Sequence, residues 1–117
     1  HRIPRRQDVT FLASAVVHEF FREGDAAVIK FLKDLKNAFP DAMFLLVEFD
    51  AISFDDIRRE TNLDRKLFTA MYELWHPLTN QGMPQPREKW ERILIAGGWN
   101  IRRVVPAKNY LLLYHCV

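Results

Sequence analysis

Two short and almost uninterrupted apolar runs constrain the fold of this chain more than any other feature. Residues 9–17 (VTFLASAVV) and 43–49 (MFLLVEF) are apolar at nearly every position, without polar–apolar alternation. Such runs are typical of strands that are buried on both faces of a parallel sheet. The chain is therefore expected to contain a parallel sheet.

The segment between the two runs predicts a helix that opens at Gly24 and Asp25 and continues to about Phe39. Its apolar residues recur at steps of four, three and four, which places them on one stripe of a helix: Val28, Leu32, Leu35 and Phe39. Pro40 ends the helix. A strand, a helix and a second strand in this order imply a right-handed parallel crossover.

A second helix is expected from about residue 64 to residue 75, with Leu67, Met71 and Leu74 as its core stripe. Residues 77–86 contain three prolines and one glycine and predict a loop.

A third helix is expected to begin at Pro86, which suits the first helical position, and to end at Gly97. Residues 99–105 and 109–116 then predict an antiparallel hairpin at the edge of the sheet. The predicted class is α/β. Because the run 9–17 needs neighbours on both sides, we expect further strands that this sequence does not contain.

Composition narrows the possible functions. At 117 residues the chain is one domain at most, and a hydrophobic content of 49% excludes disorder. The net charge of +2 and the lack of a basic face with interleaved aromatics argue against nucleic-acid binding. Cys116 is the single cysteine, which favours a cytoplasmic location, and no apolar stretch approaches the roughly 20 residues of a membrane span. The chain begins at His1 and is expected to be part of a longer protein.

His18 and Glu19 end the first apolar run, and His76 follows the second helix. Two imidazoles and a carboxylate are the ligand set of a non-haem metal site with open positions. In α/β proteins, ligands bind at the carboxyl ends of the strands. Each residue also has an ordinary interpretation: a hydrogen-bonded histidine at a strand end, an acid in a first helical turn and a histidine at a helix end.

Four segments together resemble class I S-adenosylmethionine (SAM)-dependent methyltransferases. Residues 8–21 (DVTFLASAVVHEFF) resemble the strand that ends in their His-Asp-Trp type motif, and residues 27–49 their next helix and strand, which ends in Val-Glu. Residues 78–99 (LTNQGMPQPREKWERILIAGGW) resemble their LT-x-x-G stretch with its later E-W and A-G-F, and residues 104–117 their final hairpin.

This resemblance covers nearly the whole chain, and it implies that residues 1–117 are the carboxyl-terminal half of a Rossmann-like catalytic domain. None of the four glycines forms the family's glycine-rich SAM loop. That loop is therefore expected upstream, in a missing amino-terminal half that also carries a helical dimerisation domain. The resemblance implies SAM as methyl donor, a small-molecule substrate and a homodimer.

The resemblance also assigns roles. In the O-methyltransferases the histidine of the motif is the general base on a substrate hydroxyl, and His18 matches it. An ordinary imidazole pKa of about 6.5 suits that task. Glu19 matches the aspartate of the motif, and Phe20 matches the tryptophan that lies near the adenine of the cofactor.

A narrower group, the 2-oxo acid C-methyltransferases, is similar in a further respect. It pairs a His-acidic dipeptide with a second histidine and binds iron or zinc. His18, Glu19 and His76 fit that set, with Glu in place of Asp. The ion would act as a Lewis acid that stabilises the enolate of the substrate. We therefore expect metal-assisted C-methylation of a 2-oxo acid, and the alternatives are a metal-free O-methyltransferase and a catalytically silent binding or dimerisation module.

Several other residues have both a functional and a structural interpretation. The candidates for substrate contacts are Arg22, Tyr72, Asn80 and Gln81. Of these, Arg22 could equally be a surface charge and Tyr72 a core residue. Glu48 could orient a residue of the site by a hydrogen bond, or it could cap the sheet. The residues that we expect to be structural are Trp75, Trp90, Trp99, His115 and Cys116.

Overall fold

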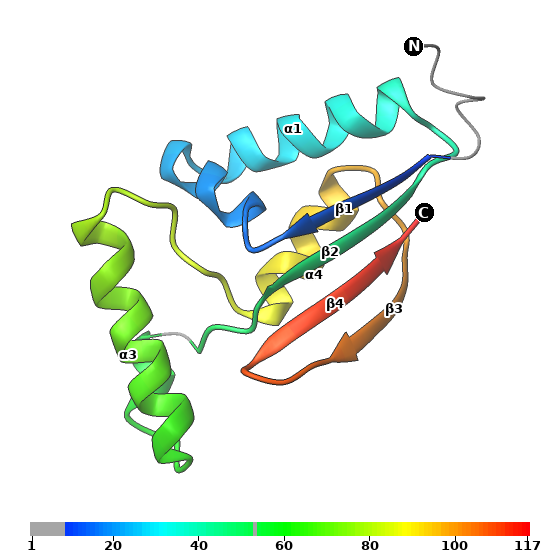
Figure 1. Cartoon of the computed structure of the whole chain (residues 1–117). Coiled ribbons are helices and arrows are strands. Elements are labelled where there is room, and N and C mark those ends of the chain that lie inside the picture. The colour runs from blue at the N-terminus through cyan, green and yellow to red at the C-terminus, as the bar shows by residue number, and fades with distance from the viewer. Residues whose placement is uncertain (1–8, 53) are drawn as a thin grey trace.

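The computed structural model describes residues 9–52 and 54–117, which form a four-stranded mixed sheet with two helices on one face and a third helix standing apart (Figure 1). In chain order the elements are β1 (Thr10–Ser14), the 3-10 helix η2 (Val17–Glu23), α1 (Asp25–Ala38), β2 (Met43–Phe49), α2 (Phe54–Ile57), α3 (Leu63–Leu78), α4 (Arg87–Ala96), β3 (Ile101–Pro106) and β4 (Leu111–Cys116). No helix of the described residues has the length and apolar character to cross a membrane.

The sheet has the strand order β1-β2-β4-β3. β1 and β2 are parallel, from the pair Thr10–Met43 to the pair Ser14–Val47. β4 runs antiparallel to both β2 and β3. The predicted α/β class, the parallel crossover and the final hairpin are thus confirmed. The hairpin differs in one respect, because β4 lies inside the sheet and only β3 forms its edge.

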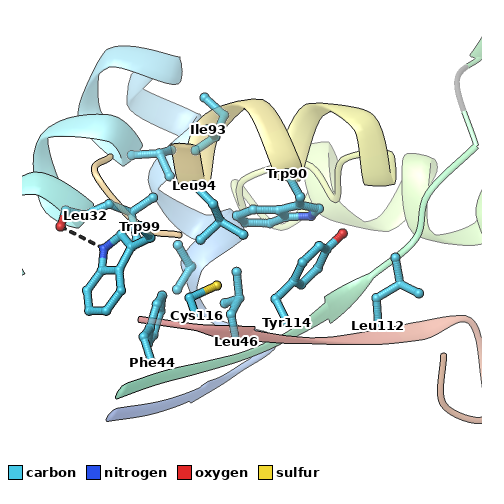
Figure 2. Close-up of a cluster of buried hydrophobic side chains, with 12 residues drawn as sticks. Leu32, Phe44, Leu46, Trp90, Ile93, Leu94, Trp99, Leu112, Tyr114 and Cys116 are labelled. Carbon is cyan, nitrogen blue, oxygen red and sulfur yellow. Dashed lines mark hydrogen bonds between the residues drawn. The ribbon is translucent and has the colours of Figure 1, made fainter. Parts of the chain in front are cut away.

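One face of the sheet carries the core, and α1 and α4 pack on it (Figure 2). The buried side chains come from these two helices, from β2 and β4 and from the segments beside them: Val17, Val28, Leu32, Phe44, Leu46, Trp90, Ile93, Leu94, Trp99, Leu112, Tyr114 and Cys116. The two helices approach closely at Gly97, where an added Cβ would lie 2.5 Å from Leu32 Cβ. The indole N–H of Trp99 donates to the Leu32 carbonyl at 3.1 Å.

The first strand is shorter and less buried than the apolar run 9–17 predicts. It ends at Ser14, because Ala15 adopts a left-handed conformation with φ of 50° and the chain then enters η2. Leu12 is 70% exposed, so the strand is not buried on both faces. The physical reason is that β1 is an edge strand of the described sheet, and that α1 and α4 cover only the opposite face.

The prediction for the second helix was wrong about its inner face. α3 runs from Leu63 to Leu78, and the expected core stripe of Leu67, Met71 and Leu74 is 60%, 59% and 65% exposed. The helix stands beyond the end of β2 instead of lying on the sheet (Figure 1).

Aromatic contacts select the inner face of α3. Phe68 and Tyr72 pack against Phe49 at the end of β2, with ring centroids 5.5 Å and 4.6 Å apart. Phe68 also contacts Tyr110, just before β4, at 5.4 Å. These rings turn the aliphatic stripe of the helix outward.

The structural residues follow the prediction with one exception. Trp90 and Trp99 are core residues and Cys116 is a buried filler, whose burial raises its thiol pKa to about 12. Trp75 was expected in the core but is 60% exposed, because α3 contributes no residue to the core on the sheet. His115 is half-buried in β4.

The Tyr114 hydroxyl is buried, and among the described residues it has no hydrogen-bond partner. Burial also raises the pKa of this phenol. An unsatisfied buried polar group costs about 1–3 kcal/mol. We expect Tyr114→Phe to raise the free energy of unfolding by roughly 1 kcal/mol, measured by urea denaturation. A less stable variant would contradict this expectation and indicate a bound water on the hydroxyl.

Candidate functional site

The candidate site forms where the two parallel strands end. Because β1 and β2 are parallel, their carboxyl ends lie at the same edge of the sheet, where α/β proteins bind ligands. After β1 the left-handed turn at Ala15 leads into η2, whose first residues include His18. Glu48 is the penultimate residue of β2. The fold therefore brings His18 next to a carboxylate 30 residues later in the chain.

Glu48 accepts three hydrogen bonds from the start of η2, two of them from His18. Its Oε1 accepts from the backbone N–H groups of Val17 at 2.9 Å and His18 at 3.2 Å. Its Oε2 accepts from Nδ1 of the His18 ring at 2.8 Å. Glu48 is 0% exposed and His18 is 4% exposed. The imidazole is therefore fixed in orientation, and its Nε2 points away from Glu48.

The environment raises the pKa of His18 above its ordinary value of 6.5. Burial alone lowers the pKa, because it penalises the charged ring. The hydrogen bond and the negative charge of Glu48, together with those of Glu19, act in the opposite direction and outweigh burial. The site thus stabilises the imidazolium that His18 becomes when it accepts a proton.

His76 faces His18 from α3. It is 3% exposed, and its Nδ1 donates to the Tyr72 carbonyl at 2.8 Å. The rings of His18 and His76 meet edge to face with centroids 5.3 Å apart. Carbonyl oxygens accept only, as does an ionised carboxylate, so each neutral ring carries its proton on Nδ1. Each Nε2 is then left as the basic nitrogen.

Both histidines line one open pocket of about 490 Å³. Its walls are Ala15, His18, Glu19, Phe49, Met71, Tyr72, Trp75, His76 and Gln81. Five of these residues are candidates that the sequence identifies: His18, Glu19, Tyr72, His76 and Gln81. Among these described wall residues there is one carboxylate and neither lysine nor arginine.

Three predicted site residues lie outside the walls of this pocket. Phe20 stacks on Phe31 of α1, with centroids 4.7 Å apart, and remains 37% exposed. The exposed Arg22 donates from Nη1 to the carbonyl of Asn80 at 3.3 Å. Phe20 and Arg22 lie in η2 and Asn80 lies in the loop after α3, and none of them is in the pocket walls. Their predicted contacts with cofactor and substrate stay predictions.

The predicted metal ligands share the pocket but do not form a ligand set. Within residues 9–52 and 54–117, no group of three or more His, Cys, Asp or Glu side chains is placed to hold a metal ion. The carboxylate of Glu19 divides its two oxygens between two different contacts. Its Oε1 lies 3.4 Å from Nε2 of His18, while its Oε2 accepts from the backbone N–H of Gly82 at 3.2 Å.

Two pocket residues on α3 were missed because the sequence pattern assigned them to the core. Met71 and Trp75 directly precede Tyr72 and His76 in the sequence, and they form the exposed rim of the pocket. Each directly precedes a candidate residue, and the two candidates, Tyr72 and His76, are one helical turn apart. This spacing was the signal in the sequence that Met71 and Trp75 also lie near the site. Phe49, at the end of β2, also lines the pocket.

No protein family matches the sequence, and neither does any curated protein. Solved structures do resemble it. Methyltransferase CalO6 matches with a TM-score of 0.70 over 98% of this chain at 18% identity. The riboflavin-derivative dimethyltransferase RosA from Streptomyces davawensis matches with a TM-score of 0.62 over 98% at 20% identity. The chain has the fold of these methyltransferases.

A third neighbour is an O-methyltransferase family 2 protein from Planctomyces limnophilus, solved in complex with apigenin. It matches with a TM-score of 0.61 over 92% of this chain at 13% identity. The chain spans about a third of the length of these neighbours, namely 36%, 33% and 30%. Identities this low show a shared fold, and activity has to be argued from the site.

The raised pKa of His18 gives a direct test of its contact with Glu48. We expect Glu48→Gln to lower the pKa of His18, because burial remains while the charge is lost, and NMR titration of the imidazole measures it. Glu19→Gln serves as the comparison and should produce a smaller decrease, since Glu19 contributes less than Glu48. An unchanged His18 pKa in Glu48→Gln would contradict the assignment.

The same shift has a consequence for stability. A pKa raised in the folded state stabilises the protein below the unfolded value of about 6.5, and this contribution is lost as the pH rises through the folded pKa. We therefore expect the difference in free energy of unfolding between the wild type and Glu48→Gln to decrease from pH 6 towards pH 9, as measured by urea denaturation at each pH.

Proposed function

We propose that this chain is part of a SAM-dependent small-molecule methyltransferase in which His18 is the general base. The single observation that carries the proposal is that His18, in the wall of the pocket, is hydrogen-bonded through Nδ1 to the buried carboxylate of Glu48. With a buried carboxylate on Nδ1, Nε2 is the nitrogen that takes a proton from the substrate atom that becomes methylated. Glu19 Oε1 lies 3.4 Å from this Nε2 and supports the charge that forms.

The chain's own residues account for the proton transfer. The Nδ1–H bond to Glu48 keeps the ring in the tautomer whose Nε2 is basic. When Nε2 takes the proton, the positive charge that forms faces the buried carboxylate of Glu48, which also raises the pKa of His18. His76 and Tyr72 form the opposite wall, and their stacked rings are suited to orient a flat substrate.

SAM would supply the methyl group. The described residues account for a small part of a SAM site: the exposed ring of Phe20, stacked on Phe31, offers a surface on which an adenine could lie. We place the remaining contacts in an upstream half of a longer protein. The neighbours, about three times as long as this chain, support that placement, as does the edge position of β1.

The pocket walls favour an aromatic substrate that carries a hydroxyl or amine. Phe49, Tyr72 and Trp75 give the walls their aromatic character. Two of the neighbours are associated with flat ring systems: one is solved in complex with apigenin, and RosA is a dimethyltransferase of a riboflavin derivative. They support the same class of substrate for this chain.

Metal-assisted C-methylation of a 2-oxo acid is the second candidate. One observation favours it, because His18, Glu19 and His76 all line the same pocket. Two observations weigh against it. The described side chains are not placed as a ligand set, and the described walls lack a cation for the carboxylate of such a substrate. A homodimer and a cytoplasmic location stay predictions.

The general base is tested in the full-length protein with SAM and a panel of phenols and aromatic amines. We expect His18→Ala to lower kcat at least about 100-fold, the contribution of a positioned base. SAM affinity, measured by calorimetry, should remain unchanged. His115→Ala is the matched control, since that histidine lies in β4 away from the pocket walls. Full activity of His18→Ala would disprove the role, and an inactive wild type that binds SAM would favour a silent module.

Elemental analysis of the untagged protein separates the two candidate reactions. We expect no stoichiometric metal in the wild type or in His76→Ala. Near-stoichiometric iron or zinc that is lost in His76→Ala would instead support the metal-assisted reaction.

A further inference from the structure

The loop after α3 lies directly on the backbone of η2 at Gly82. A Cβ added to Gly82 would lie 2.0 Å from the carbonyl oxygen of His18 and 2.7 Å from Cα of Glu19. Contacts this short do not occur for real Cβ atoms, and the atoms in the way belong to the backbone, which cannot rotate aside. Glycine is therefore required for the loop to occupy this position.

Two hydrogen bonds attach the same loop to η2. The backbone N–H of Gly82 donates to Oε2 of Glu19 at 3.2 Å. The side chain of Arg22 donates to the carbonyl of Asn80 at 3.3 Å. Both bonds join segments about 60 residues apart in the sequence, so they are tertiary ties between the loop and η2.

The other end of the loop is attached to the end of α3. The backbone N–H of Gln81 donates to the carbonyl of His76 at 2.8 Å, and that of Asn80 donates to Pro77 at 3.2 Å. Asn80 has a φ of 55°, which closes this turn tightly. His76 is thus linked through two short turns to the point where Gly82 rests on His18.

We propose that Gly82 is a positioning residue, which sets the separation of the His18 and His76 rings and with it the width of the pocket. The ring of His18 is held independently, by Glu48 on β2. The ring of His76 moves with the end of α3. The contact at Gly82 joins the two and so keeps the ring of His76 beside the ring of His18.

The first test needs no enzyme activity. In full-length protein with isotope-labelled histidine, the rings of His18 and His76, 5.3 Å apart by centroid, should give a nuclear Overhauser effect between their protons. We expect Gly82→Ala to abolish that signal. Gly98→Ala is the control for backbone strain without a clash, since the φ of 85° strains an alanine there while an added Cβ meets only Lys36 Cγ at 3.7 Å. That variant should keep the signal.

The second test rests on the proposed function. We expect Gly82→Ala to raise KM for the acceptor substrate about tenfold, because a pocket of altered width makes poorer contacts with it, and about 1.4 kcal/mol of lost binding is a factor of ten. The pH at which kcat rises should not move, since Glu48 still holds His18. A loss of folded protein alone would lower the apparent kcat and leave KM unchanged.

The outcomes separate the two proposals. A folded Gly82→Ala that keeps the full signal between the rings overturns the role of Gly82, whatever its activity. If the wild type transfers no methyl group, the proposed function is wrong. The nuclear Overhauser effect between His18 and His76 then still decides the role of Gly82. If Gly82→Ala does not fold, one glycine inserted between Asn80 and Gln81 releases the same tie without a steric clash. That variant should also lose the signal, and its retention would count against the proposal.

Discussion

The buried carboxylate of Glu48 is the interaction on which the site and the local fold both depend. An unpaired carboxylate in the core costs several kcal/mol, so it has to be matched by donors. Glu48 finds three, two backbone N–H groups at the start of η2 and the imidazole of His18. The first N–H groups of a helix have no partner within it, and a negative charge is favourable there. One side chain of β2 therefore ends β1, begins η2 and orients the proposed base.

The position of Glu48 in β2 explains why this arrangement is specific. Phe44, Leu46 and Glu48 are the buried residues of that strand and point to the same face, toward α1 and α4. A carboxylate at the third of these positions would be unfavourable in any register that did not also present the start of η2. The polar residue thus constrains the pairing of β1 with β2, and the apolar residues beside it supply the burial.

The sequence alone was sufficient to predict those elements whose buried residues in the structure follow the periodicity of their apolar residues. β2, α1 and α4 could be predicted from apolar residues at the spacing of a strand or a helix, and the parallel pairing followed from their order. β1 was predicted too long because Val17 is apolar, while its backbone N–H is bonded to a carboxylate 31 residues away. The stripe on α3 correctly indicated a helix but could not show that Phe49 and Tyr110 would contact the neighbouring, aromatic side. Contacts distant in the sequence decided both cases.

The same limit applies to the chemistry of the site. The residue types His18, Glu19 and His76 suit either a metal or a proton transfer, and the sequence brings all three to one pocket. In both cases a histidine with Nδ1 bonded to an oxygen acceptor offers Nε2 to the pocket. The residue that distinguishes the two is Glu19, because one of its oxygens accepts from Gly82 while the other lies beside Nε2 of His18. A carboxylate held in this way supports an imidazolium more readily than it joins a shared ligand set, which is why the geometry favours His18 as a base.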